Sequence, residues 1–235
     1  SAKSWASLRA WRGSSRPAHA DQLHVEVWRK GVNVISDAGS YRYNTAAPWD
    51  NRLAGTRSHN TISINGLDQA TRAGKFLWLD WAHAEVLERT AGVISARHDG
   101  YRRLGVEHRR RLEQVDETTW RVVDTLTASK PKKGAFCLRW LLRDFPVEFD
   151  PQGLSLALGS ETLRLKVGSE SSLTRWAVRA GELIHGEGQV LETDGWISPT
   201  YSVREAAIQY CILASERLPV QFITTIQFLP AGKAG

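Results

Sequence analysis

Alternation of apolar and polar residues with a period of two is the feature that most constrains this chain of 235 residues. It is clear in residues 23–28 (LHVEVW) and again in residues 61–64 (TISI). Such alternation is typical of strands that bury one face. After the first dozen residues, no segment keeps a helical period. Further strand patterns occupy 32–36, 84–88, 106–114, 119–127, 136–142, 162–167, 173–178, 207–213 and 221–228.

Turn residues such as Gly31, Asn65-Gly66 and Asp99-Gly100 separate these strands. The helices that would connect the strands of a parallel sheet are missing from the pattern. We therefore predict an all-β fold, a large antiparallel β-sandwich. Residues 1–235 are expected to form a single sandwich domain, in which residues 1–16 are a lead-in strand or connector.

The composition excludes several classes of protein. Hydrophobic residues make up 42% of the chain and charged residues 24%, which is ordinary for a globular protein and excludes a disordered or collagenous chain. No apolar run approaches the roughly 18 residues of a membrane span. The net charge of +6 and the basic run at residues 108–111 raise the question of nucleic-acid binding. Alternation splits that run across two faces and acidic residues surround it, so we predict a solvated strand with ion pairs and no nucleic-acid partner.

The chain opens with Ser1-Ala2-Lys3 and contains no methionine, so we expect it to be a piece of a longer protein. Its two cysteines, Cys137 and Cys211, are too few for a disulfide framework and too far apart for a CxxC motif. Buried free thiols are the simpler prediction. Their pairing and the redox compartment stay open.

Three polar clusters at strand edges form the candidate site. His19 precedes the strand at 23–28, Asp37 follows the strand at 32–36, and His59 precedes the strand at 61–64. If the first two strands form a hairpin through Lys30-Gly31, His19 and Asp37 are neighbours at one rim of the sheet, where His59 can join them. Two imidazoles and a carboxylate are suitable ligands for zinc. The alternative is that the histidines cap strands or bind backbone carbonyls.

The same clusters carry a resemblance to a known family. The runs HADQLH (19–24), DAGSYRYN (37–44), SHNT (58–61) and NGLDQ (65–69), with YRRLGV (101–106) and GWISP (195–199) further on, resemble the C-terminal β-sandwich region of the heparinase II/III family of polysaccharide lyases. The resemblance implies a polysaccharide-lyase type of sandwich that follows a helical toroid domain, with the substrate in the cleft between them. It also implies cleavage of acidic, uronate-containing polysaccharide by β-elimination.

The resemblance implies roles for individual residues as well. His19, Asp37 and His59 match the family's zinc ligands in order, and the ion would most simply order the loops that face the cleft. The first histidine of the family's His-x-His element falls at Pro17, which puts a direct catalytic role for that position in doubt. The tyrosine and the asparagine or histidine of the elimination belong to the toroid. We therefore expect the isolated chain to be inactive, and the family suggests export to the bacterial periplasm or beyond.

Five residues are predicted to face the substrate. Tyr41 is the candidate catalytic phenol of the cleft, and Arg42 beside it can bind a carboxylate through two parallel hydrogen bonds. The alternative is aromatic packing under a loop. His24, Arg57 and Trp49 are candidate substrate-binding residues. His24 has a structural or second-shell alternative, Arg57 can be an ordinary surface residue, and Trp49 can belong to a packed interface. Trp49 lies in the long stretch 43–59, which has no strand period and is itself a site candidate.

Two other functions stay open at this stage. One is a carbohydrate-binding or structural sandwich without catalytic activity, which sequence upstream of Ser1 would distinguish from a lyase. The other is a mutarotase-like sugar epimerase, which would need a complete His and Glu acid-base pair within this chain. The positive net charge is consistent with an acidic glycan partner.

Overall fold

The computed structural model describes residues 4–232, which form two large antiparallel sheets and therefore confirm the predicted all-β sandwich. Within these residues there is no α-helix. Three short 3-10 turns are present: Arg52–Ala54 (η1), Thr56–Ser58 (η2) and Arg102–Leu104 (η3). No helix in this part of the chain has the length and apolar character needed to cross a bilayer.

The first sheet has nine strands and includes the ends that position the candidate site. Its hydrogen-bonded order is β1 (Ser4–Leu8), β2 (Val25–Arg29), β3 (Val32–Ile35), β11 (Lys133–Arg143), β18 (Glu205–Arg217), β15 (Leu173–Arg179) and β16 (Glu182–Gly186), with β4 (Ile62–Ile64) also paired to β11 and β17 (Trp196–Ile197) also paired to β18.

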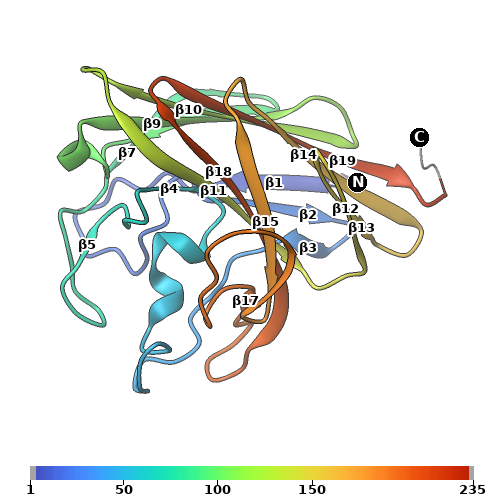
Figure 1. The fold of residues 1–235 in the computed structure, drawn as a ribbon, viewed down its shortest axis with the longest axis horizontal. Coiled ribbons are helices and arrows are strands. Elements are labelled where there is room, and N and C mark those ends of the chain that lie inside the picture. The colour runs from blue at the N-terminus through green and yellow to red at the C-terminus, as the bar shows by residue number, and fades with distance from the viewer. Residues whose placement is uncertain (1–3, 233–235) are drawn as a thin grey trace.

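The second sheet has eight strands and lies against the first in a second layer (Figure 1). Its order is β12 (Val147–Asp150), β13 (Gly153–Ala157), β14 (Glu161–Gly168), β19 (Val220–Pro230), β10 (Thr119–Ala128), β9 (Val106–Gln114), β8 (Val93–His98) and β7 (Ala84–Thr90). A small separate ribbon pairs β5 (Thr71–Arg72) with β6 (Trp78–Leu79).

Most of the strand predictions agree with the structure, and the predicted hairpin through Lys30-Gly31 joins β2 to β3. Both turn residues have positive φ, 48° and 81°, as a tight turn between twisted antiparallel strands requires. The lead-in segment contributes the edge strand β1. The alternation did not reveal β5, β6, β8, β12, β13, β16 and β17, which are short or lie directly beside turn residues.

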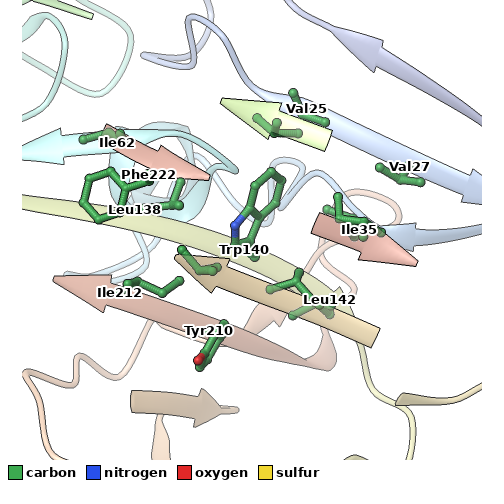
Figure 2. Packing of buried hydrophobic residues seen from close by; sticks show 14 of the residues in the cluster. Val25, Val27, Ile35, Ile62, Leu138, Trp140, Leu142, Tyr210, Ile212 and Phe222 are labelled. Atoms are coloured by element: carbon green, nitrogen blue, oxygen red, sulfur yellow. The ribbon is translucent and has the colours of Figure 1, made fainter. Parts of the chain in front are cut away.

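The core lies between the two sheets and is built by the inward residues of both. Figure 2 shows the Trp140 ring at its centre, with Val25, Leu142 and Tyr210 around it. Phe222 of β19 reaches the same cluster from the second sheet. These side chains are fully or almost fully buried. Strands with one face in this core and the other face in solvent therefore alternate apolar and polar residues.

The outer face of the nine-stranded sheet is also covered, and this departs from simple alternation. Seven consecutive residues of β11, 136–142, are buried because the segments 36–61 and 187–198 pack across that face. Cys137 and Cys211 lie there on the neighbouring strands β11 and β18 as buried free thiols, as predicted. Figure 1 shows the segment around η1 and η2 and the loop at β17 on the same side of the molecule.

A row of hydrogen-bonded polar side chains crosses the interior. It corrects the interpretation of residues 108–111 as a wholly solvated strand. His98 Nε2 lies 3.1 Å from His108 Nδ1, and His108 Nε2 lies 2.6 Å from Asp124 Oδ1. Arg110 donates to both oxygens of Asp124, at 2.6 and 3.0 Å. His108, Arg110 and Asp124 are fully buried, whereas Arg109 faces solvent. Alternation therefore divides the basic run correctly, but the sandwich buries one of the two faces.

The hydrogen bonds in this row of side chains show which nitrogen of His98 and which nitrogen of His108 carries the proton. The Gly100 N–H donates to His98 Nδ1, so His98 Nε2 carries the proton that is donated to His108, and His108 in turn donates to Asp124. Burial and the neighbouring His108 hold the pKa of His98 well below its usual range. Burial also lowers the pKa of His108, although Asp124 acts in the opposite direction. Both rings are neutral in the folded state.

Acidification is therefore expected to destabilise the fold below about pH 6.5, where free imidazoles bind protons. The unfolded chain binds protons on these imidazoles near pH 6.5, while the folded chain does not, so stability is complete above that pH and falls below it. Each imidazole that stays neutral contributes a slope of about 1.4 kcal/mol per pH unit. Urea unfolding between pH 7.5 and 5.5 measures this slope. The variant His98→Gln should show a smaller slope than the wild type, and an equal slope would contradict the assignment.

Candidate metal centre

Four side chains with metal-binding atoms meet at one rim of the nine-stranded sheet. His19, Asp21, Asp37 and His59 each offer an atom, and these atoms all lie within 4.8 Å of one another. The ring centroids of His19 and His59 are 5.1 Å apart, and Asp37 Oδ2 lies 3.5 Å from His59 Nδ1. The structure thus brings together the three residues that the sequence singled out and adds Asp21.

Hydroxyl groups tie the two histidine segments to each other. The Thr56 hydroxyl donates to the Ala20 carbonyl at 2.7 Å, and the Thr61 hydroxyl donates to the Gln22 carbonyl at 2.9 Å. Thr56 belongs to η2, which ends immediately before His59. Because both cross-links are buried, residues 19–22 and 56–61 are held at fixed separation.

Asn60 joins this pair of segments to three strands. Its side-chain N–H groups donate to the carbonyls of Val25 and Ser36, and its side-chain oxygen accepts from the Leu141 N–H at 2.6 Å. Its backbone N–H donates to His24 Nδ1 at 3.0 Å. The Asn60 amide is fully buried, and its donors and acceptor are all paired with β2, β11 and the end of β3. These bonds fix the position of the neighbouring residue, His59.

Asp37 is positioned by the turn that follows β3. Its Oδ1 accepts from the Gly39 N–H at 2.6 Å, which directs Oδ2 toward the histidines. Gly39 has φ of 68°, and a Cβ there would lie 2.2 Å from the Ser198 carbonyl oxygen. Glycine is therefore required at this position, both for the backbone conformation and for the close approach of residue 198.

The donor set fits a divalent metal ion by a test that is independent of the spacing. Both ring nitrogens of His59 and Oδ2 of Asp21 are buried without a hydrogen-bond partner among the described residues. Buried polar atoms are normally paired, so these atoms have bonding capacity left for a ligand. Imidazole nitrogens and carboxylate oxygens are the zinc donors of catalytic and structural sites. The site could hold a metal through His19, Asp21, Asp37 and His59.

The charges of the site are consistent with a bound cation. Burial lowers the pKa of His19 to about 4, which leaves its imidazole neutral as a metal ligand requires. Burial acts to lower the pKa of His59, but the carboxylate of Asp37 outweighs it and raises that pKa. Burial acts to raise the pKa of Asp37, and His59 and His24 together hold it well below its usual range. Asp37 is therefore ionised at neutral pH, as a carboxylate ligand must be.

His24 stands behind the site and does not face a surface. It is 3% exposed, and its Nδ1 accepts from Asn60 while its Nε2 points to Asp37 Oδ2 at 3.6 Å. Burial lowers its pKa to about 4. This geometry corresponds to the second-shell alternative for His24, in which it orients the Asp37 carboxylate, and leaves it out of reach of a bound polysaccharide.

Two hollows flank His19 and open the site to solvent. One has a volume of about 130 Å³ and is lined by Asp21, and the other has a volume of about 220 Å³ and is lined by Ser40, Tyr43 and Asn51. Pro17 lines both hollows. It occupies the place where the family resemblance implies a histidine, and its side chain has no group that can transfer a proton.

The other predicted substrate residues divide into two groups. Tyr41 and Trp49 lie together, with ring centroids 5.4 Å apart, and the Arg42 guanidinium carbon is 5.0 Å from the Tyr41 ring centroid. Arg57 is separate from them. Its Nε and Nη2 donate to the two carboxylate oxygens of the buried Asp194, at 2.8 and 2.7 Å. Arg57 therefore has a structural role, because this ion pair holds the loop that covers β18.

Sequence reasoning missed Asp21 and Arg204. Asp21 stands in the first cluster, two residues after His19. A spacing of two would place both side chains on one side of an extended segment, and this was the available signal. Arg204 lies against the rings of Trp49 and Trp196. No pattern in the sequence pointed to it, because its partners come from segments that only the fold brings together.

Comparison with solved structures gives the same fold at low sequence identity. A heparinase III with methylated lysines superposes with a TM-score of 0.74 and 16% identity, covering 97% of this chain and 33% of that chain. The heparan sulfate lyase HepC from Pedobacter heparinus gives 0.70 and 15%, covering 92% and 31%. Another heparinase III gives 0.66 and 18%, covering 90% and 30%. The chain thus spans about a third of the length of these proteins.

Comparison with curated protein sequences gives no significant match. A family described as heparinase II/III-like, C-terminal, matches residues 9–229. That range includes every candidate ligand and all strands of the two sheets except β1 and the last residue of β19. The chain therefore belongs to the heparinase II/III-like C-terminal family.

Proposed function

We propose that this chain is the β-sandwich part of a lyase that cleaves acidic, uronate-containing polysaccharide by β-elimination, with zinc held by His19, Asp37 and His59. The observation that supports it is the set of unpartnered, buried metal-binding atoms at a rim open to solvent, in a member of this family. Asp21 has a free oxygen and completes a set of four ligands.

Elimination makes three chemical demands. The uronate carboxylate must be neutralised so that the proton on C5 becomes acidic, a base must remove that proton, and an acid must protonate the leaving oxygen on C4. Bound zinc would supply a fixed positive charge that orders the segments at residues 18–24 and 36–61. The hollow beside His19 offers the Tyr43 phenol and the Asn51 amide as hydrogen-bonding groups for a sugar.

Tyr41 is the proposed cleft tyrosine of this chain. Its ring is partly exposed and lies near two guanidinium groups, with Arg42 at 5.0 Å and Arg204 at 5.5 Å from its centroid. Two cations beside a phenol make a site that attracts an acidic sugar. In this proposal the remaining acid-base groups belong to a helical domain of a longer, exported polypeptide, and the substrate lies between the two domains.

A second candidate is a carbohydrate-binding sandwich without catalytic activity. Pro17 favours it, because it removes the one imidazole that the family resemblance places beside the zinc ligands in this chain. The positively charged aromatic surface around Tyr41 serves this function equally well. Both candidates predict binding of the polysaccharide, but only the lyase candidate predicts its cleavage.

Turnover tests the proposal. We expect residues 1–235 alone to release no unsaturated uronate from heparan sulfate, hyaluronan or alginate, because this chain does not supply the complete acid-base set. A longer polypeptide that includes the proposed helical domain should release it, and ultraviolet absorbance of the product measures the rate. Activity of the isolated chain would contradict the division of labour. An inactive long form that still binds these polymers would favour the carbohydrate-binding candidate.

A further inference from the structure

An arginine sits in the angle between two perpendicular tryptophans on the face that carries Tyr41. The ring centroids of Trp49 and Trp196 are 6.0 Å apart at an interplanar angle of 80°. The guanidinium carbon of Arg204 lies 4.2 Å from the Trp49 centroid and 4.3 Å from the Trp196 centroid. These two cation–π contacts hold the guanidinium in place.

The two indoles are themselves anchored by one residue. Trp49 Nε1 donates to the Glu192 carboxylate at 2.7 Å, and Trp196 Nε1 donates to the Glu192 backbone carbonyl at 3.0 Å. Trp196 also begins β17, which pairs with β18 directly after Arg204. The angle between the rings is therefore built into the fold and exists before any ligand arrives, which reduces the entropy lost on binding.

Arg204 keeps its hydrogen-bonding edge free. It is exposed, and within residues 4–232 it makes no hydrogen bond and no ion pair. Arg57 and Arg143, by contrast, bind Asp194 and Glu205. The nearby Glu192 uses its carboxylate on Trp49 and does not pair with Arg204. A guanidinium has five N–H donors in its plane, and no described residue accepts a hydrogen bond from those of Arg204.

A second guanidinium also lies near the Tyr41 ring. Arg42 is 5.0 Å from the Tyr41 ring centroid and Arg204 is 5.5 Å from it. Arg42 donates only its Nε, to the Ser202 hydroxyl at 3.2 Å, so its two terminal NH₂ groups are available as well. Two guanidinium groups thus lie near one phenol ring, and each has N–H donors available to a ligand.

We infer that Arg204, with Arg42, forms a subsite for the anionic groups of an acidic saccharide, with Arg204 as its principal ligand. The inference rests on the proposed function and extends it to a named residue. Planar guanidinium groups bind carboxylate and sulfate oxygens in pairs, and the adjoining aromatic edges suit the apolar faces of sugar rings. Both anions share this chemistry, so the choice of oligosaccharide distinguishes them.

Calorimetric titration with three hexasaccharides tests the subsite. The probes are an unsulfated glucuronate-containing hexasaccharide, a sulfated heparan hexasaccharide, and neutral maltohexaose. Arg204→Gln should weaken binding of the acidic probe that uses the subsite by about tenfold or more, since a lost hydrogen-bonded charge pair has an effect of this order. Arg42→Gln should weaken it by a smaller factor. The acidic probe with the larger loss identifies the anion as carboxylate or sulfate.

Arg121→Gln is the matched control, because Arg121 is 49% exposed and lies on β10, where it pairs with Glu113. This variant should bind like the wild type, and circular dichroism confirms that each variant is folded. Wild-type affinity of Arg204→Gln and Arg42→Gln for both acidic probes would overturn the subsite and leave the proposed function standing. Failure of the wild type to bind either acidic probe, or binding of maltohexaose with equal affinity, would count against both.

Discussion

Replacing Arg110 by methionine should lower the free energy of unfolding by about 3–5 kcal/mol, the range for removing one partner of a buried ion pair. Arg110 and Asp124 are fully buried, and two nitrogen atoms of Arg110 bind the two oxygens of Asp124 at 2.6 and 3.0 Å. Methionine would leave the Asp124 carboxylate in the core with His108 as its only partner. Urea unfolding at neutral pH measures the loss.

The same substitution should reach the candidate metal centre. Arg110 Nη1 donates to the backbone carbonyls of Leu23 and Asn60, which belong to the two segments that carry the histidines. The side chain of Arg110 extends from β9 in one sheet to the rim of the other sheet. Without it, both carbonyls lose a hydrogen bond, and the positions of His19 and His59 become less well fixed. Metal affinity is expected to fall together with stability.

Two further variants make this prediction specific. Arg109→Met changes the neighbouring residue, which is exposed and donates to the Ser95 hydroxyl at 3.2 Å, and should cost less than about 0.5 kcal/mol. The double variant Arg110→Met with Asp124→Asn should be more stable than Arg110→Met alone, because the uncompensated charge is gone and His108 keeps an acceptor. Equal stability of the Arg110 and Arg109 variants would refute the proposed role of the buried pair.

Zinc should bind the wild-type chain near one ion per chain and be lost from His59→Ala. Both ring nitrogens of His59 are buried without a hydrogen-bond partner among the described residues, so alanine removes a candidate ligand together with its 3.5 Å contact to Asp37 and breaks no hydrogen bond of the ring. At zinc concentrations about a hundredfold above Kd, binding should stabilise the wild type by about 2.7 kcal/mol. Elemental analysis after dialysis and thermal unfolding with and without zinc measure the two effects.

His185→Ala is the control for this experiment, because His185 stacks on Phe149 at 4.1 Å and belongs to β16, away from the ligand segments. It should retain zinc. Asp21→Asn then separates three ligands from four: weaker retention would make Asp21 the fourth ligand, and unchanged retention would leave the set as His19, Asp37 and His59. Folded wild-type protein that binds no zinc would end the metal proposal.

The prediction that His19, Asp37 and His59 lie together at one rim agrees with the structure, because it depended on local pairing. A two-residue turn at Lys30-Gly31 sets β2 beside β3, so residues just before one strand and just after the other must meet at one rim. Asp37 follows β3 and His19 precedes β2, and the meeting of the two needed no knowledge of the second sheet. His59 joins them because β4 pairs with β11 in the same sheet.

The prediction for Arg57 shows where this reasoning stops. Its place two residues before His59 suggested a ligand for an anionic sugar, but the structure gives its guanidinium an internal carboxylate, Asp194, from a segment far along the chain. Arg204, which no pattern distinguished, has no such partner and keeps its donors open. Spacing along the chain does not reveal which arginine meets an acid, because the pairing is made by loops that cover the sheet.

By itself the sequence determined most of the strands, the alternation of their two faces and the gathering of His19, Asp37 and His59, since these follow from backbone geometry over a few residues. The tertiary structure alone decided which polar side chains are buried. Alternation says that His108 and Arg110 share a face of β9, but only the second sheet makes that face the interior, where desolvation forces Arg110 onto Asp124 and turns a basic run into a structural ion pair.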